Sequence, residues 1–412
     1  MDDLRAELGA FDADAPLTPA PDPWDYLPMP ALRDAPPWAM AEMIAAEPAL
    51  ASRIVARLVG DGSAAGLAAA IREAAMTGGA VIVTGCGTSE HAAQGAAEIL
   101  REAWRAAGLP GAGPAPAQAF ELALDPPPGG LVIGVSHEGG TGATIAALDA
   151  AVAAGSRTAL LTGSAGSPAA AVADVVLATV EMDRSWCHTV GYVSPMVAAV
   201  VAADLLAGRT PNGAALGRRL RDGIEAAHAA GPDGARPDGT IAAALAGAAN
   251  LLVVASGADR VAARELVLKI EEAAWLPSAM RDLETFLHGH LPATGPDTAL
   301  VVILADPAAR EPRVRRARQA LAAARELGLR AAAILAADAS AAIPAELTPA
   351  GRVVVPEAPA LPGATASLLG TAGPLQLLTL AIAGERGTNP DPIRRDDPRY
   401  LRAAEVADGP DG

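Results

Sequence analysis

Short apolar segments alternate with longer stretches of helical spacing along most of this chain. Apolar runs that read as buried strands occupy residues 80–84 and 131–135 in the first half, and 251–256, 299–305 and 330–336 in the second. Most are followed by a turn and then by apolar residues three or four positions apart, which is the spacing of an amphipathic helix. Parallel strands need a crossover of about this length, so the alternation predicts βαβ units.

The alternation occurs twice, on either side of a linker rich in Gly, Pro and Asp at residues 231–239. We therefore expect an α/β fold with two doubly wound parallel-sheet lobes in tandem. The first lobe, with a helical segment before its sheet, is expected at 38–230 and the second at 240–386. The acidic, Pro-rich residues 1–37 are expected to be extended or loosely attached, and residues 387–412 to form a charged tail.

Composition excludes several classes of partner. The chain has 31 Lys and Arg against 47 Asp and Glu, a formal net charge of −16, which argues against nucleic acid and anionic membranes. A small anionic ligand remains compatible, because backbone amides and hydroxyls can hold one. The two cysteines, Cys86 and Cys187, are too few for a disulfide framework. No apolar run reaches the ~20 residues of a membrane helix and the acidic N-terminus is unlike a signal peptide, so a cytoplasmic location is expected.

Two glycine-rich turns, GCGTSEH (85–91) and SHEGGTG (136–142), each follow a predicted strand and open a predicted helix. Such turns place free backbone N–H groups and the positive end of a helix dipole at the carboxyl edge of a sheet. Neither turn has the Lys-Ser/Thr of an ATP-binding loop or the GxGxxG of a dinucleotide site. Two interpretations remain, an anion site or ordinary capped turns. The hydroxyls that would complete an anion site are those of Thr88, Ser89, Ser136 and Thr141.

The segment ELVLKIEEAAW, residues 265–275, carries the only lysine of the chain, Lys269. Helical spacing places it on one side with Glu265 and Glu272. Every other cationic side chain is Arg, which cannot supply a compact or deprotonatable amine, so the single lysine favours a functional role. The alternative is an ordinary ion pair four residues apart on an exposed helix.

Taken in order, these motifs resemble a known family. GCGTS after one strand, S-x-x-G-x-T after the next, and E-x-x-x-K-x-x-E followed by an H-G step resemble the tandem SIS (sugar isomerase) domain family. The likeness is to the isomerase half of glutamine–fructose-6-phosphate aminotransferase and to related amino-sugar-phosphate isomerases, deaminases and deglycases. Residues 41–49, 374–378 and 387–391 add to it, so that it spans about 38–400.

The resemblance implies an enzyme that isomerises, deaminates or deglycates an amino-sugar phosphate through an enediol or enediolamine. It implies no cofactor and no metal, an anionic sugar derivative as ligand, and a homodimer. The chain has no nucleophilic cysteine at position 2, so glutamine-dependent amination by this chain alone is not expected. By the same resemblance Glu272 is the base, Lys269 helps to organise the open-chain substrate, and His288 assists ring opening from the neighbouring subunit. The positions that match substrate contacts are Gly87, Thr88, Ser89, Ser136, His137, Gly139 and Thr141.

Three positions depart from the family pattern. Glu138 stands where a serine usually contacts phosphate, and a carboxylate there would repel a dianion. Three explanations are open: the Glu138 side chain points away from the ligand, it accepts a hydrogen bond from a substrate amine or hydroxyl, or the ligand carries no phosphate. Val190 replaces a common lysine, and the terminal lysine of relatives is missing. A non-catalytic sugar-phosphate sensor is therefore the alternative function. Arginines in the region of the missing lysine are Arg394, Arg395, Arg399 and Arg402.

The other histidines and cysteines have ordinary expectations. His91 is expected to be solvated near its helix cap, and Cys86 to be a small buried thiol. Cys187 and His188 are neighbours in sequence, which does not make a catalytic pair. The histidines that flank Gly289 lack a third ligand at suitable spacing, so no metal site is expected there.

Overall fold

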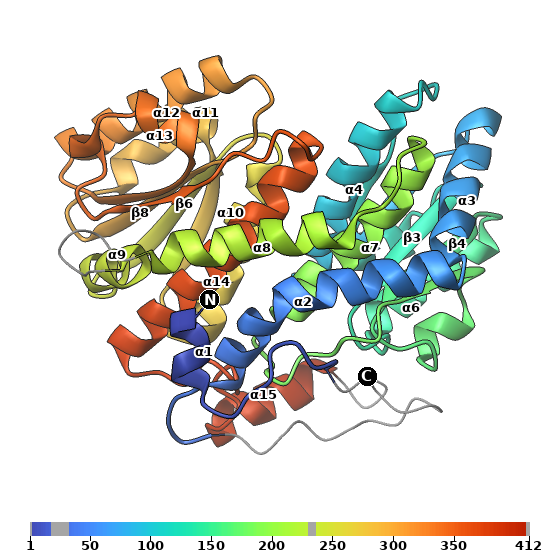
Figure 1. The fold of residues 1–412 in the computed structure, drawn as a ribbon, viewed down its shortest axis with the longest axis horizontal. Coiled ribbons are helices and arrows are strands. Elements are labelled where there is room, and N and C mark those ends of the chain that lie inside the picture. Colours follow the sequence, from blue (N-terminus) through green and yellow to red (C-terminus); the bar gives the residue numbers. More distant parts are fainter. Residues whose placement is uncertain (1, 18–32, 230–235, 409–412) are drawn as a thin grey trace.

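The computed structural model describes residues 2–17, 33–229 and 236–408, and it contains two lobes that lie side by side (Figure 1). Each lobe is built on a five-stranded sheet in which every pairing is parallel. The predicted tandem α/β fold is therefore confirmed. The first sheet has the order β2-β1-β3-β4-β5, and its strands are β1 (Val81–Gly85), β2 (Ala115–Gln118), β3 (Leu131–Ser136), β4 (Arg157–Thr162) and β5 (Val175–Ala178).

The second sheet repeats the plan with the order β10-β9-β8-β6-β7. In both sheets the first strand of the lobe lies between the second and the third: β1 pairs with β2 and β3, and β6 pairs with β7 and β8. The strands of this lobe are β6 (Asn250–Ala255), β7 (Ser278–Asp282), β8 (Thr298–Leu304), β9 (Arg330–Ala336) and β10 (Arg352–Val355).

Helices cover both faces of each sheet. Those on the outer faces are α5 (Ala119–Leu124) and α6 (Gly142–Ala153) in the first lobe, and α12 (Arg310–Glu326) and α13 (Ala337–Ala342) in the second. One continuous apolar core joins the inner faces of the two sheets. The helices that contribute to this core are α2 (Ala39–Gly60), α3 (Ser63–Thr77), α4 (Thr88–Ala106), α7 (Val190–Leu206), α8 (Gly213–His228), α9 (Pro237–Leu245), α10 (Asp259–Ala274) and α14 (Gly363–Arg386).

The small side chains of this chain allow the core helices to approach closely. A Cβ atom on Gly223 of α8 would lie 2.5 Å from the carbonyl oxygen of Gly370 in α14. A composition that is 51% hydrophobic but only 3% aromatic suits this arrangement, because alanine and glycine fill little space between helix axes.

Helix α14 is long and apolar. It begins at Gly363, ends at Arg386 and holds Pro374 in its interior. Its length and composition would suit a membrane span. The expectation that rested on long apolar runs did not identify this segment. However, 89% of its most apolar window is buried inside the fold, as in a core helix. Packing on both sides therefore outweighs the unfavourable placement of proline within a helix.

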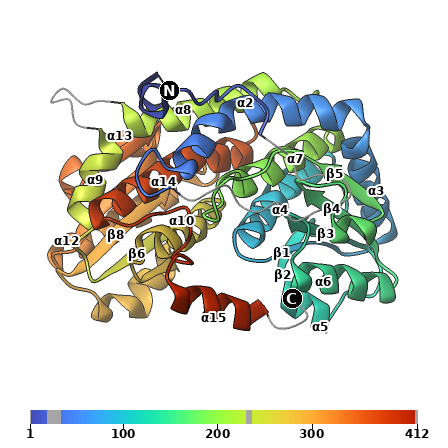
Figure 2. The ribbon, with the colours of Figure 1, turned by 90° about the horizontal axis from the view of Figure 1, so that it is seen from below.

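The expectation of a loosely attached N-terminus is wrong for its described part. Residues 2–17 form α1 (Asp2–Leu8) and a following turn, and Leu4 and Leu17 are each only 1% exposed. The backbone N–H of Leu17 also donates to Glu181. Residues 18–32 lie outside the described part of the chain, as do residues 231–235 of the predicted linker, and Pro237 already opens α9. The charged C-terminal tail contains a helix, α15 (Pro398–Asp408), which lies beside the two lobes (Figure 2).

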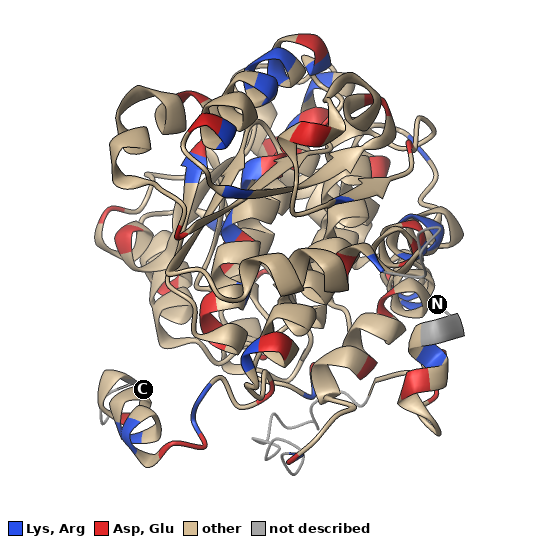
Figure 3. Ribbon diagram, turned by 90° about the vertical axis from the view of Figure 1, so that its left-hand side faces the viewer, with Lys and Arg blue, Asp and Glu red and all other residues tan. Residues whose placement is uncertain are grey.

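Charged side chains are interspersed over the surface. In the view of Figure 3, acidic and basic residues both occur on many helices and loops of the fold. On α12, which the sequence marks as a basic helix, Arg313 pairs with Asp306 and Arg316 pairs with Glu284. Its basic character is thus partly neutralised by neighbouring carboxylates.

Candidate active site

A cavity of about 260 Å³ lies where the carboxyl edge of the first sheet meets α10 of the second lobe. Both glycine turns contribute to its wall, together with the segment before α7, helix α10 and the C-terminal segment. Its lining residues are Cys86, Thr88, Ser89, His137, Glu138, Thr141, Trp186, His188, Glu272, Ile393 and Arg395.

The glycine turns present hydroxyls and helix N-termini to this cavity. Thr88 is the first residue of α4, and Thr141 immediately precedes α6. Ser136, at the end of β3, is buried and donates to the Thr141 hydroxyl at 3.3 Å, so that it supports the wall without lining it. Gly139 has φ +76°, and a Cβ there would collide with Ser167 Oγ, so that only glycine fits this turn. Because the first N–H groups of a helix have no partner within it, this wall suits an anion or a polyhydroxy ligand.

The corresponding turns of the second lobe are filled by the chain's own side chains. Asp259 accepts from the backbone N–H groups of Ala305 and Asp306 at 2.8 and 2.9 Å. Asp306 in turn accepts from the N–H of Ala258 and pairs with Arg313. The carboxylates of Asp259 and Asp306 therefore accept from the backbone N–H groups that could otherwise bind an anion. Among the described residues, we find turns with N–H groups available to an anion in the first lobe.

Lys269 is buried between two carboxylates. Its Nζ lies 2.6 Å from Glu272 Oε2 and 3.7 Å from Glu265 Oε1, and its side chain is 1% exposed. Burial alone would lower the pKa of Lys269, but the charge of Glu272, with those of Cys187 and Glu265, outweighs burial and raises the pKa above its usual value. The exposed ion pair of the alternative interpretation is therefore wrong. The lysine acts as a permanent ammonium and not as a deprotonatable amine.

Glu272 connects this buried charge to the cavity. Its side chain is 21% exposed and it lines the cavity, whereas Lys269 lies behind it. Burial raises the pKa of Glu272, and the ammonium of Lys269 lowers it only in part. A carboxylate with a raised pKa and one oxygen bonded to a fixed cation can accept a proton from a ligand in the cavity.

His91 joins the same charge cluster from the other lobe. Its Nδ1 lies 2.8 Å from Glu265 Oε2, and its side chain is 15% exposed. The expectation of a solvated histidine is therefore wrong. His91 comes from α4 and Glu265 from α10, so the contact links the helix after the first glycine turn to the helix that carries Glu272.

His137 lines the cavity with a side chain that is only 3% exposed. Its Nε2 accepts from the backbone N–H of Asp183 at 3.0 Å, which assigns the proton of the neutral ring to Nδ1. This Nδ1 is buried and has no hydrogen-bond partner among the described residues. Since buried polar groups are nearly always bonded, this nitrogen needs a partner that the described residues do not supply.

The segment before α7 brings residues that the sequence did not mark. Trp186 and His188 line the cavity, and burial lowers the pKa of His188 to about 3, so its ring is neutral near pH 7. Cys187, between them, is fully buried and lies near Lys269 and Glu272; burial raises the pKa of its thiol. No glycine turn or recurring motif precedes these residues, so the sequence held no signal for them.

His288 does not reach the cavity of its own chain. Its side chain is 71% exposed and contacts Glu284 at 2.8 Å and Arg316 at 3.3 Å. Glu284, one helical turn before His288, thus holds the imidazole. A contribution of His288 to the cavity of a neighbouring subunit stays a prediction.

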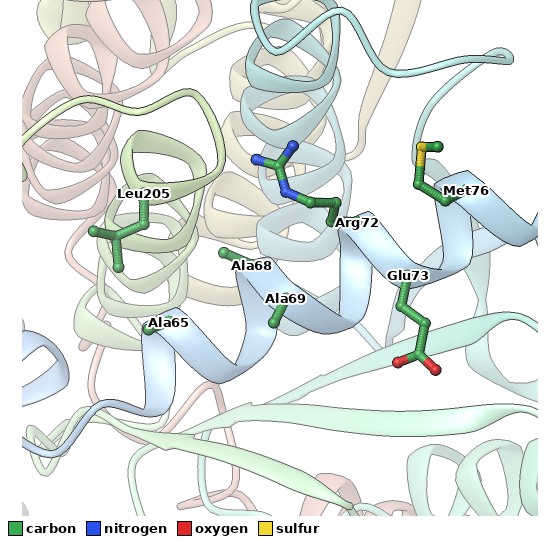
Figure 4. Close-up of a pocket in the computed structure, with 7 residues that line it drawn as sticks. All are labelled: Ala65, Ala68, Ala69, Arg72, Glu73, Met76 and Leu205. Carbon is green, nitrogen blue, oxygen red and sulfur yellow. The ribbon is translucent and has the colours of Figure 1, made fainter.

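A larger depression of about 600 Å³ lies on the outer side of α3 (Figure 4). Its walls are mostly apolar, and Arg72 and Glu73 are its ionisable residues. Arg72 donates to the carbonyl of Leu206, and Glu73 pairs with Arg157. Because no group of polar side chains converges there, the smaller cavity at Glu272 is the candidate active site.

Comparison with known proteins agrees with this geometry. Residues 78–209 match the SIS domain family. The comparison with curated proteins gave no match. The match places a SIS domain in the first lobe, and the second lobe repeats its parallel-sheet architecture, as the sequence motifs led us to expect.

Solved structures share the fold over most of the chain. The C-terminal domain of glucosamine-fructose-6-phosphate aminotransferase from Francisella tularensis superimposes with a TM-score of 0.71 at 15% identity, covering 88% of this chain and 99% of that one. Tagatose-6-phosphate ketose/aldose isomerase from Escherichia coli gives 0.67 at 19% identity, covering 90% and 98%. Glucosamine-6-phosphate deaminase from Thermotoga maritima gives 0.55 at 17% identity, covering 76% and 87%. By their names these neighbours are an aminotransferase domain, a ketose/aldose isomerase and a deaminase, all of them at low identity.

Proposed function

We propose that this chain is a sugar-phosphate aldose–ketose isomerase, or a deaminase or deglycase of the same chemistry, and that its substrate is an amino-sugar phosphate. The observation that carries the proposal is the position of Glu272, which meets the hydroxyls of both glycine turns in one cavity. The names of the structural neighbours support the choice of a phosphorylated sugar. No cofactor is needed, since proton transfer next to a carbonyl requires a base and electrophilic help.

Each residue at the cavity has its own role in the proposed proton transfer. Glu272 removes a proton from the carbon next to the carbonyl of the open-chain sugar and returns it to the neighbouring carbon. Lys269 holds the carboxylate in place at 2.6 Å. The negative charge that develops on the enediolate oxygens is met by the side chains of His137 and Thr88, which line the same cavity. In the deaminase or deglycase form, proton return to the neighbouring carbon converts the enolamine into an imine, and a water molecule hydrolyses this imine to a carbonyl and the free amine.

We further propose that the chain works as a homodimer in the cytoplasm. The exposed position of His288, away from the cavity of its own chain, supports a second copy as the source of the ring-opening histidine.

The decisive experiment replaces the base. Glu272→Gln is expected to bind ligand but to lose exchange of the C1 or C2 hydrogen with solvent, measured by NMR in D2O with a panel of sugar phosphates. Glu271→Gln is the matched control, because Glu271 is exposed and accepts from the N–H of Ser278. Glu272 must be ionised to act, and its pKa is raised. As the pH is lowered, hydrogen exchange by the wild type should therefore decline at a higher pH than it would with a glutamate of ordinary pKa. Exchange that persists in Glu272→Gln would refute its role.

A non-catalytic sugar-phosphate sensor is the second candidate, and Glu138 favours it. Its carboxylate lines the cavity at the turn where a phosphate is expected. A wild-type protein that binds sugar phosphates but exchanges no hydrogen across the panel would establish the sensor in place of the enzyme.

A further inference from the structure

The C-terminal segment between α14 and α15 supplies part of the cavity wall. Ile393 and Arg395 both line the cavity. The segment is anchored just before them by Asp391, which is 1% exposed. Its carboxylate accepts from the backbone N–H groups of Ala39 and Met40 at 2.8 and 2.9 Å, at the start of α2. The segment is therefore fixed to the body of the protein as it reaches the cavity.

An unfavourable backbone conformation turns the segment toward the cavity. Ile393 and Arg394 have φ values of 43° and 66°, in the left-handed region. A β-branched residue rarely adopts this region, and such conformations persist where the surrounding structure imposes them, most often at functional sites. The N–H of Arg395 closes the turn by donating to the carbonyl of Pro392 at 2.9 Å.

Arg394 contacts two aromatic rings. Its guanidinium carbon lies 4.4 Å from the ring centroid of Trp275 and 4.0 Å from that of Tyr400, distances typical of cation–π contacts. We call this arrangement the Arg394 clamp. Trp275 follows Glu272 by three residues at the end of α10, so the clamp ties the C-terminal segment to the helix that carries the proposed base.

Arg395 is left free to bind a ligand. Its guanidinium carbon lies 5.2 Å from the ring centroid of Trp186, and within the described parts of the chain no carboxylate lies within ion-pair distance of it. Among the lining residues it is the cation, whereas Glu138 and Glu272 are anions and Glu272 is already bonded to Lys269. An unpaired guanidinium supported by an aromatic ring binds phosphate or carboxylate through two parallel N–H bonds.

We propose that Arg395 binds an oxyanion substituent of the ligand, a phosphate or a carboxylate, and that the Arg394 clamp is the device that positions it. The proposal rests on the proposed function in that it takes the same cavity as the ligand site. It also answers the difficulty raised by Glu138, because a guanidinium in the same cavity offsets the carboxylate that would otherwise repel an anion.

The test measures binding in the Glu272→Gln background, where turnover cannot complicate it. Calorimetric titrations would use glucosamine 6-phosphate, glucuronate and, as the probe without an oxyanion, glucosamine. Arg395→Gln is expected to weaken binding of the oxyanion probe by about tenfold to a hundredfold, the effect of losing a charge-assisted pair. Binding of glucosamine should not change. If the affinity for glucosamine 6-phosphate falls, Arg395 binds a phosphate of the ligand; if the affinity for glucuronate falls, it binds a carboxylate.

Arg402→Gln is the matched control, since it removes the same charge from an exposed position on α15 and should leave all affinities unchanged. Tyr400→Leu removes one ring of the clamp and leaves the cavity lining intact. It should weaken the oxyanion probe by less than Arg395→Gln does and leave glucosamine unaffected. If it lowers thermal stability without changing this selectivity, the clamp is structural only and the positioning role is wrong.

The proposal fails if Arg395→Gln binds the oxyanion probes as tightly as its parent, or if the parent binds neither of them better than glucosamine at millimolar concentrations. These outcomes are separate from the test of catalysis. Hydrogen exchange can depend on Glu272 whether or not Arg395 binds an oxyanion, and a protein without exchange can still select its ligand through Arg395.

Discussion

The single lysine of the chain shows how a residue count can point to a site. Lys269 stood out because arginine serves as the cation everywhere else. The structure gives a physical reason for the choice. The buried space between Glu265 and Glu272 admits a compact ammonium at 2.6 and 3.7 Å from the two carboxylates, whereas the broader, planar guanidinium of arginine would need a different arrangement.

Removal of this ammonium should destabilise the protein strongly. Lys269→Met leaves Glu265 and Glu272 facing each other in a buried place, and loss of one partner from a buried ion pair costs roughly 3–5 kcal/mol. Urea unfolding at pH 7 would measure the loss. The double variant Lys269→Met/Glu272→Gln should recover part of it, because one of the stranded charges is gone. A change in unfolding free energy of Lys269→Met within about 0.5 kcal/mol, the range of ordinary surface changes, would contradict the buried ion-pair description.

Glu138 gives a second prediction at the scale of one residue. If the ligand carries its phosphate at the second glycine turn, Glu138→Ser should tighten binding of a sugar phosphate, since a nearby negative charge is removed. Titration of the sugar phosphate and of the corresponding free sugar into both proteins would separate a charge effect from a general one. Unchanged or weaker binding of the sugar phosphate would show that this carboxylate does not oppose a phosphate and instead accepts from the ligand.

Part of the candidate site was predictable from the sequence, and part was not. The cavity brings together Thr88, Thr141 and Glu272, which lie in motifs with a recognisable order along the chain. His188 reaches it from a segment without a local motif, and Arg395 was only one of four arginines near the missing lysine, so the tertiary fold alone shows which side chains line the cavity. A residue that enters a site through packing alone leaves no periodic signal in its sequence.

At the scale of the elements, the central strands were the easiest to predict. The apolar runs at 131–135 and 330–336 differ from β3 and β9 by at most one residue, because buried parallel strands are apolar on both faces. The edge strands β2, β7 and β10 were not predicted. β2 reads APAQ and β7 reads SAMRD, and their side chains are partly or fully exposed, so proline and charged residues are tolerated there.

Close helix packing gives a prediction at this scale. Gly223→Ala should push α8 and α14 apart, because the added Cβ would lie 2.5 Å from the carbonyl oxygen of Gly370, and overpacking of this kind costs about 1–3 kcal/mol. Gly384→Ala in α14 is the control, since a Cβ there meets nothing within 4 Å and alanine favours a helix by up to about 1 kcal/mol. Thermal unfolding of both variants would decide. Equal stability of the two would show that the helices can separate without loss.

At the scale of the whole molecule, the two lobes share an architecture but contribute differently to the site. The first lobe offers the hydroxyls and helix N-termini of its glycine turns, and the second offers Glu272. One core runs through both lobes, and His91 contacts Glu265 across the boundary between them. The fold likeness to phosphosugar isomerases and deaminases extends over both lobes as well.

The internal carboxylates at the strand ends of the second lobe have one more consequence. Asp259 and Asp306 already bond the backbone amides there, so the duplicated lobe behaves as though its own ligand were permanently built in. At saturating ligand concentration, the protein should therefore bind one ligand molecule per polypeptide. The first lobe therefore supplies the turns that bind the ligand and the second lobe supplies Glu272. Neither lobe on its own would hold the complete site.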